Sequence, residues 1–339
     1  MYSFVEYYKI FNDSQGGKIM ERYVIGIDLG GSKIATCIID KKGKILKKIT
    51  IPTLAQEGPA SVIARIQESV YDVVKKHNID MSNIVGIGIG SPGPLDAERG
   101  IIKNPPNLLG WNNIPLSEIL QQSFRVPVCL ENDANAAALG EKLYGSGKGI
   151  DNFIYITIST GIGGGLVVGD KIFKGSNGNA CEIGHMTINF EGPRCGCGNK
   201  GCWEAYASGT ALARFALKGI NKGIKTIIKD IAGKKDIKAE HVFLAAKQGD
   251  EFAIQIVDRE GYYLGVGLAN VVNVFNPKCI SIGGGLSHEW DMFSFRMLQV
   301  MKEYSLKANL ENLKVVKATL GPDVGVVGAA AVAWGIIGN

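Results

Sequence analysis

Residues 23–39 read Tyr-Val-Ile-Gly-Ile-Asp-Leu-Gly-Gly-Ser-Lys-Ile-Ala-Thr-Cys-Ile-Ile, and the rest of the fold can be worked out from this stretch. The apolar run over 23–29 is typical of a buried strand, two glycines interrupt it, and a second apolar run follows over 34–39. A charged turn at 41–43 then leads into a third predicted strand over 44–51. The opening is therefore predicted to be a β-meander with a glycine-rich first turn.

The same order of elements returns later in the chain. A predicted strand over 153–158, a glycine turn over 160–165 and a strand over 166–168 repeat the opening. Internal repetition of a supersecondary unit predicts two lobes of related topology that face each other. A chain of 339 residues also exceeds the usual size of one hydrophobic core, so we expect a cleft between two lobes.

Apolar spacing predicts the elements outside the repeats. Apolar positions recur at helical spacing within 60–76, and a strand follows over 84–89. Another strand, over 126–130, leads into an alanine-rich helix, so the chain is predicted to be α/β. In the second half we expect a strand over 279–282 and helices over 238–248, 251–275, 289–307 and 325–337.

Composition and charge exclude several classes of protein. Hydrophobic residues make up 46% and charged residues 20% of the chain, as in ordinary globular proteins. The formal charge of +5 is modest, and no basic stripe with stacking aromatics predicts nucleic-acid binding. No run of about eighteen apolar residues predicts a membrane span. The N-terminus lacks a secretory signal, so we expect a cytoplasmic protein. Met20 is a possible true start of the chain, in which case residues 1–19 would be a disordered or misassigned extension.

Two glycine-rich turns, at 28–33 and 160–165, are candidates for gripping the phosphates of a nucleotide from opposite sides, and a third glycine turn lies at 283–285. Glycine has no Cβ, so the backbone N–H groups of such turns can approach an anion closely. Asp28 is the candidate for a position near the magnesium ion. Each turn alone is equally well explained as a tight hairpin. The spacing fits neither a P-loop nor a Rossmann fingerprint, since a strand follows Gly31.

Residues 131–137 read Glu-Asn-Asp-Ala-Asn-Ala-Ala, at the point where a predicted strand gives way to a helix. Polar side chains at the carboxyl end of a strand point into a crevice. Phosphoryl transfer to a hydroxyl needs a carboxylate that accepts the hydroxyl proton and aligns the oxygen for attack. Asp133 is the candidate for this catalytic base. The alternative is that Asp133 only caps the following helix.

One histidine and three cysteines, His185, Cys195, Cys197 and Cys202, match the ligand number of a tetrahedral structural zinc site. The chain has seven cysteines, and their clustering favours metal binding over disulfides. The alternative is that these are free, reduced thiols. Four protein ligands leave no open position for catalysis, so the ion is expected to order a loop. The second ring nitrogen of His185 stays free to contact another group, such as a sugar hydroxyl.

Together these motifs resemble those of the ROK family (repressor, open reading frame, kinase), which contains bacterial glucokinases and other hexose and N-acetylhexosamine kinases. The resemblance implies a ribonuclease-H-like, actin-type α/β fold of two lobes, with sugar and ATP in the central cleft. It also implies a homodimer. It runs from about Tyr23 to the C-terminus, and its most specific segments are 28–33, 131–137, 159–165, 182–185 and 195–204.

The resemblance also implies lobe boundaries and residue roles. We expect one lobe over 20–134, joined by the C-terminal helix at 325–339, and another over 135–324 that carries the zinc loop. Asp133 would be the base. The sugar hydroxyls would be bound by Asn104, Asn132, Asp133, Glu182, His185 and Glu204. The nucleotide would be bound by Asp28, Gly30, Gly31, Ser32, Lys33, Thr160, Gly161 and Gly163, with Gly284, Gly285 and Leu286 in the adenosine-side turn.

Two departures from the family pattern affect the rims of the site. Many members have Gly-Thr where this chain has Ser159-Thr160, and many have Ala-Gly where this chain has Ala180-Cys181. The segment before the first strand is too short for the helix-turn-helix domain of the family's repressors, which favours the kinase branch.

The predicted activity is ATP-dependent phosphorylation of a hexose at its 6-hydroxyl, with Mg²⁺ and a structural Zn²⁺ as cofactors. Glucose is the first choice because the loop over 104–111, Asn-Pro-Pro-Asn-Leu-Leu-Gly-Trp, looks like the glucokinase version. The alternatives are a kinase of N-acetylglucosamine or N-acetylmannosamine, and a non-catalytic sugar sensor. Neither nucleic acid nor a membrane is expected as a partner.

Overall fold

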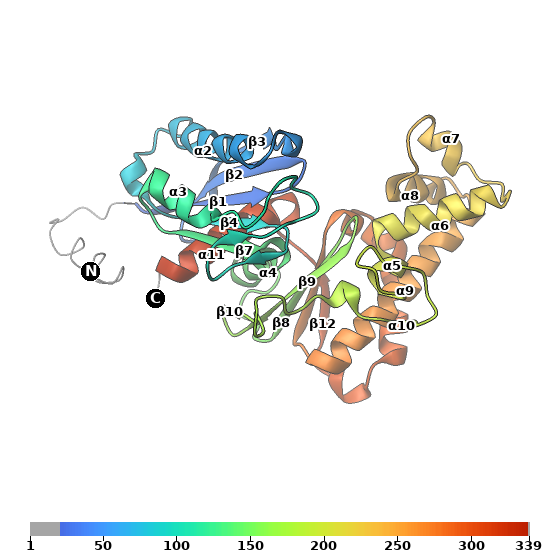
Figure 1. The fold of residues 1–339 in the computed structure, drawn as a ribbon. Helices are drawn as coiled ribbons and strands as arrows, with labels where there is room; N and C mark the ends of the chain where they lie inside the picture. The colour runs from blue at the N-terminus through green and yellow to red at the C-terminus, as the bar shows by residue number, and fades with distance from the viewer. Residues whose placement is uncertain (1–20, 338–339) are drawn as a thin grey trace.

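The computed structural model describes residues 21–337 of the 339-residue chain (Figure 1). The extension predicted for 1–19 lies outside the described residues. Two five-stranded sheets form the frames of two lobes. No helix within 21–337 is long and apolar enough to cross a bilayer.

The first sheet is built from the opening meander and two later strands. It contains β1 (Tyr23–Leu29), β2 (Lys33–Ile39), β3 (Ile45–Pro52), β4 (Ile84–Ser91) and β7 (Val128–Asn132). The spatial order is β3-β2-β1-β4-β7, with antiparallel pairing among the first three strands and parallel pairing of β4 to β1 and β7. Every residue of β1 except Asp28 is buried, which confirms the predicted buried strand.

The second sheet repeats this arrangement. It contains β8 (Phe153–Ile158), β9 (Ile162–Val168), β10 (Lys171–Ile172), β11 (Cys279–Gly283) and β12 (Lys314–Lys317). The order is β10-β9-β8-β11-β12, again with three antiparallel strands followed by two parallel ones. The predicted internal repeat is therefore confirmed. A separate hairpin pairs β5 (Leu95–Asp96) with β6 (Ile101–Ile102).

The helices cover both sheets and fill the space between them. They are α2 (Pro59–Lys75), α3 (Leu116–Phe124), α4 (Asp133–Tyr144), α5 (Glu204–Ala207), α6 (Gly209–Asn221), α7 (Ile228–Ala232), α8 (Ala239–Lys247), α9 (Glu251–Phe275), α10 (Trp290–Tyr304) and α11 (Val324–Ile337). Short 3₁₀ turns are η1 (Ala55–Glu57), η2 (Met81–Asn83), η3 (Ile183–His185), η4 (Gly285–Glu289), η5 (Lys307–Asn309) and η6 (Gly321–Asp323).

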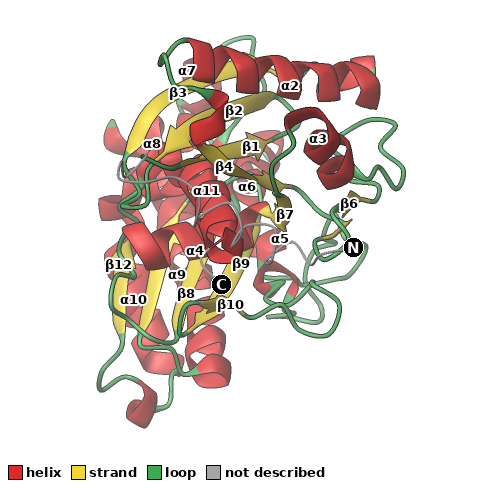
Figure 2. Ribbon diagram, turned by 90° about the vertical axis from the view of Figure 1, so that its left-hand side faces the viewer, coloured by secondary structure: helices red, strands yellow, loops and turns green. Residues whose placement is uncertain are grey.

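Three helical layers enclose the two sheets (Figures 1 and 2). α2 and α3 pack on the outer face of the first sheet, and α5, α6, α8, α9 and α10 pack on the outer face of the second. α4 and α11 lie between the sheets. Glycine permits this close packing, since a Cβ on Gly88 of β4 would lie 1.8 Å from the carbonyl oxygen of Ala329 in α11. Because α4 and α11 contact each other as well as the sheets, the exact lobe boundary at 134 stays a prediction.

The glycine stretch over 160–165 is not a single turn, and that prediction was wrong. β9 begins at Ile162, so the connection from β8 consists only of residues 159–161. A Cβ on Gly165 would lie 2.6 Å from the Cβ of Ala138. Gly165 therefore allows α4 to pack against β9, and the glycines over 163–165 belong to the strand and not to a loop.

Candidate active site

Asp28 and Asp133 lie at the same edge of the first sheet, because β1 and β7 run in the same direction and end there. Asn132 caps α4, since its side-chain oxygen accepts hydrogen bonds from the backbone N–H groups of Ala134 (3.0 Å) and Asn135 (3.2 Å). Asp133 accepts from the Ala134 N–H through Oδ1 at 2.8 Å. The capping role considered for Asp133 is thus filled by Asn132.

A first cavity of about 500 Å³ is lined by polar side chains from both lobes. Asp133 and Asn132 come from the first lobe, and loops after β10 and around η3 supply the other side. It brings together most of the predicted sugar-binding set: Asn132, Asp133, Glu182, His185 and Glu204.

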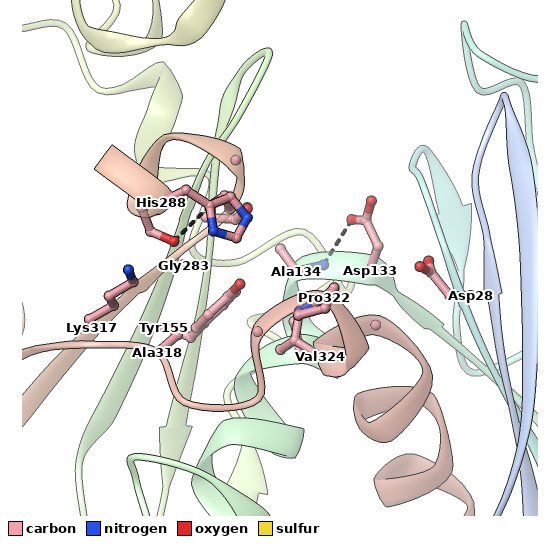
Figure 3. Close-up of a pocket in the computed structure, with 17 residues that line it drawn as sticks. Asp28, Asp133, Ala134, Tyr155, Gly283, His288, Lys317, Ala318, Pro322 and Val324 are labelled. Atoms are coloured by element: carbon pink, nitrogen blue, oxygen red, sulfur yellow. Dashed lines mark hydrogen bonds between the residues drawn. The ribbon is translucent and has the colours of Figure 1, made fainter. Parts of the chain in front are cut away.

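A second cavity of about 310 Å³ lies on the other side of Asp133. Figure 3 shows Asp28 and Asp133 on one side of it and His288 and Lys317 on the other. Gly284 and Gly285, at the predicted adenosine-side turn, also line it. Asp133 therefore faces both cavities, so molecules held in the two cavities would meet at one carboxylate.

A third cavity, of about 530 Å³, adjoins the second and shares Gly285 and His288 with it. It contains two further predicted nucleotide contacts, Thr160 and Leu286. The ring of Phe243 also lines it. The third cavity is mostly apolar, and the second, which adjoins it, contains the charged side chains of Asp28, Asp133 and Lys317. Such a pair of cavities suits a nucleoside with attached phosphates.

The pKa of Asp133 is raised to about 6. The carboxylate is reachable by water from the cleft, but surrounding protein atoms reduce its hydration, and this is the main cause of the rise. The N–H of Ala134 opposes the rise, and the negative charges of Asp28 and Glu182 add to it. A carboxylate with a pKa nearer neutrality is a better proton acceptor.

Several predicted residues lie outside these cavities. Asn104 is exposed and does not line the first cavity, whereas Asn107 of the same loop does. The β1–β2 turn contacts that loop, since a Cβ on Gly31 would lie 2.7 Å from the carbonyl oxygen of Asn107. Gly163 lines the first cavity, on the sugar side. Asn104 lines none of the three cavities, and neither do five of the predicted nucleotide-binding residues, Gly30, Gly31, Ser32, Lys33 and Gly161.

The four predicted metal ligands lie together, with all ligand atoms within 4.8 Å of one another. The Nδ1 of His185 lies 3.8 Å from the Sγ of Cys195, and the sulfurs of Cys197 and Cys202 are 3.6 Å apart. Ligands about 2.3 Å from a tetrahedral zinc ion are separated by about 3.8 Å, so these spacings suit such an ion. They are too long for a disulfide, whose S–S bond is about 2.05 Å.

Glu204 links this cluster to the β8–β9 connection. Its Oε2 accepts a hydrogen bond from the Ile162 N–H at 2.9 Å, and its Oε1 lies 3.5 Å from the Sγ of Cys195. A Cβ on Gly161 would lie 2.3 Å from Oε2, so a larger residue at this position would displace the Glu204 carboxylate. One side chain therefore contacts the metal cluster, the connection at 159–161 and the first cavity.

Asn135, which is not among the predicted sugar-binding residues, is a buried member of the motif over 131–137. Asn135 is 2% exposed, and its Nδ2 donates to Glu131 Oε1 at 3.2 Å. It lines the first cavity, as do Asn107 and Asn179. No periodicity in the sequence indicates this contact, because Glu131 lies in a strand and Asn135 belongs to the helix that follows.

A family model, the ROK family, matches residues 24–335 of this chain. The chain belongs to the ROK family. A relative from Thermotoga maritima, a glucokinase, is 39% identical over 310 residues, which cover 91% of this chain and 96% of the relative.

Two solved structures of the family extend this comparison. A ROK hexokinase from Thermus thermophilus is 35% identical with a TM-score of 0.81, covering 93% of this chain and 99% of that one. A ROK family glucokinase from Streptomyces griseus, solved in complex with glucose and AMPPNP, is 34% identical with a TM-score of 0.77, covering 92% and 99%. The two-lobed, actin-type α/β fold expected from the sequence is confirmed.

Proposed function

We propose that this ROK protein is an ATP-dependent kinase that phosphorylates glucose at its 6-hydroxyl. The observation that carries the proposal is that one carboxylate, Asp133, lines two adjoining cavities in the cleft. One cavity is rich in hydrogen-bonding side chains suited to a sugar, and the other adjoins an apolar compartment suited to a nucleoside. The similarity to a glucokinase solved with glucose and AMPPNP supports this choice of substrates.

In the proposed reaction, Asn132, Glu182 and His185 hold the sugar hydroxyls and exclude water from them. Asp133 accepts the proton of the 6-hydroxyl as that oxygen attacks the γ-phosphorus atom of ATP. The bond from this phosphorus to the bridging oxygen of ADP breaks, and the electron pair leaves with ADP. The sugar phosphate, ADP and a protonated Asp133 result.

We propose that the adenosine of ATP occupies the third cavity, against Phe243 and Leu286. Its phosphates then extend past Thr160 toward Asp133. The first-lobe turn, with Gly30, Gly31, Ser32 and Lys33, lies outside the cavities and is expected to reach the phosphates when the lobes close. Asp28 is the side chain that would hold Mg²⁺, which would neutralise charge on the phosphates.

We propose that zinc occupies the site of His185, Cys195, Cys197 and Cys202. The ligand atoms converge, and the set is complete without a water molecule. Such an ion supplies rigidity to the loop between Ile183 and Glu204. It leaves the chemistry to Asp133.

The proposed function is tested by measuring ADP release with glucose, mannose, fructose, N-acetylglucosamine and N-acetylmannosamine. Glucose is expected to give the highest kcat/KM. A preference for an N-acetylated sugar would instead identify an N-acetylhexosamine kinase. Sugar binding without any ADP release would identify a sugar sensor and overturn the proposal.

The raised pKa of Asp133 in the free protein predicts the pH dependence of kcat/KM for glucose. Asp133 acts as a base only when ionised, so kcat/KM should be nearly constant above pH 7 and fall as the pH drops through about 6. At pH 5 about a tenth of the kcat/KM should remain. The profile is measured with glucose well below its KM, with circular dichroism to confirm that the protein stays folded. A kcat/KM that is unchanged between pH 7 and pH 5 would contradict the assignment.

We propose that the chain forms a homodimer through α9 and α10. Large apolar side chains are exposed there, with Phe295 at 81% and Val274 at 69%. The hydroxyls of Tyr262 in α9 and Tyr304 in α10 lie 3.3 Å apart, so the two helices pack against each other.

Light scattering should give a mass of about 73 kDa for the dimer, twice the chain mass of 36.3 kDa. Phe295→Asp should give a monomer, whereas Phe190→Asp, an equally exposed phenylalanine on the zinc loop, should leave the mass unchanged.

We also propose that the two lobes, 20–134 with 325–339 and 135–324, move as units when the sugar binds. The expected place of action is the cytoplasm, where ATP is available.

A further inference from the structure

An ion pair joins the two sheets beside the sugar cavity. β7 is an edge strand of the first sheet and β10 an edge strand of the second. Glu131 lies in β7, and Lys174 follows β10. The Nζ of Lys174 lies 2.6 Å from Glu131 Oε2, and the side chain of Glu131 is only 1% exposed, against 46% for Lys174. A buried carboxylate of one lobe is thus neutralised by a lysine of the other.

The carboxylate of Glu131 contacts one residue on each side of the proposed base, the adjacent Asn132 and Asn135 two positions further on. Its Oε1 accepts a hydrogen bond from the backbone N–H of Asn132 at 3.0 Å and another from Asn135 Nδ2 at 3.2 Å. Asn132 and Asn135 line the first cavity with Asp133. Any displacement of the Glu131 side chain therefore shifts one wall of that cavity.

Lys174 begins the loop that forms the opposite wall. Residues 174–180 read Lys-Gly-Ser-Asn-Gly-Asn-Ala, and the Ala180 N–H donates to the Lys174 carbonyl oxygen at 3.2 Å, which closes the loop on itself. The residues near its end, Gly178, Asn179 and Ala180, line the first cavity. Gly175 and Gly178 have φ of 66° and 85°, conformations that glycine adopts without strain but that add no side-chain contacts.

We propose that Lys174 is a positioning residue that fixes the loop over 174–180 against the wall containing Asp133, and so sets the affinity for the sugar. Among the described residues, the pair between Lys174 and Glu131 is the one ion pair that connects this loop to the first lobe. Because Glu131 is buried, its charge favours a cation at this position much more strongly than a surface carboxylate would. This inference rests on the proposed sugar-kinase function.

The test compares Lys174→Met, which keeps the length of the side chain but removes the charge, with Lys174→Arg, which keeps the charge. Lys174→Met should raise the KM for glucose about tenfold, while the KM for ATP changes less than about twofold, because only one wall of the sugar cavity is released. Lys174→Arg should restore most of the affinity. Lys171→Met, on the exposed surface of β10, is the matched control and should behave as the unchanged protein.

A second measurement does not depend on turnover. Hydrogen exchange of the peptide over 174–181 should be at least about tenfold faster in Lys174→Met. The reason is that the hydrogen bond from the Ala180 N–H to the Lys174 carbonyl oxygen breaks when the loop opens. Peptides of the zinc loop should exchange at their usual rate. Combining Lys174→Met with Glu131→Gln should add little to the larger of the two single effects, since both remove the same contact.

The outcomes separate this inference from the proposed function. If the unchanged protein releases ADP with none of the sugars, the proposed function fails. If it phosphorylates glucose but Lys174→Met keeps the glucose KM within twofold and the exchange of 174–181 unchanged, the role of Lys174 is overturned. An equal rise in both KM values, with a lower melting temperature, would also overturn it, because it would indicate a general structural role.

Discussion

Replacement of Asp133 with asparagine is expected to reduce kcat by about 10²–10⁴, the usual contribution of general base catalysis. The amide has nearly the same shape as the carboxylate and can still accept the Ala134 N–H, so the start of α4 should remain intact. It cannot accept the proton of the sugar hydroxyl. Calorimetry should therefore show glucose binding close to that of the unchanged protein, while ADP release falls to near the detection limit.

A matched control separates chemistry from folding. Asp151→Asn makes the same chemical change at an exposed residue at the start of the second repeat. It should leave both kcat and the glucose KM unchanged. Near-normal turnover by Asp133→Asn would show that another group accepts the proton, whereas loss of glucose binding together with turnover would show a structural role for Asp133.

The two-lobed fold could be predicted because its evidence is local. Apolar runs, glycine interruptions and the repeat at 153–168 each depend on residues close together in the sequence. The helices α3 and α6 were not predicted, although α6 is amphipathic and begins at a Ser208 cap. The glycines of β9 were misinterpreted because Gly165 packs against α4, which lies elsewhere in the chain. In the sequence alone, a glycine that permits close helix packing looks the same as a glycine in a turn.

The site was predictable where a motif holds several functional residues, and less so where distant segments meet. Glu204 and Ile162 are 42 positions apart, and nothing in either segment indicates their hydrogen bond. Asn104 and Asn107 belong to one loop, and only the three-dimensional course of that loop shows that Asn107 lines the first cavity. Lys174 looks like any surface lysine until its buried partner is known.

Cys181 shows how a departure from the family pattern acquires physical meaning. It has a φ of 67°, in the left-handed region that glycine adopts freely and other residues adopt at a cost. A glycine, as in the family pattern, would adopt this conformation without strain. In this chain the residue before Glu182 is a cysteine, whose side chain packs against the core of the second lobe.

Removal of the proposed zinc ion is expected to have the second-largest effect. Cys197→Ser replaces an exposed ligand, so the substitution itself disturbs little packing. Without the ion, its four ligands are no longer held together, and the loop from His185 to Glu204 is expected to become mobile. Both of these residues line the first cavity. The glucose KM should rise about 10- to 100-fold, the range typical when the support of a metal site is disturbed.

The KM for ATP serves as the internal control for this test. Phe243, Leu286 and Gly285 lie outside the loop, so the KM for ATP should change less than about threefold. Elemental analysis should find about one zinc ion per chain in the unchanged protein and none in Cys197→Ser. Treatment with a strong chelator should reproduce the effect in the unchanged protein, and added zinc should reverse it there but not in the variant. An active enzyme without bound metal, or one whose glucose KM survives complete removal of the metal, would refute the proposed role because the loop would then hold its shape unaided.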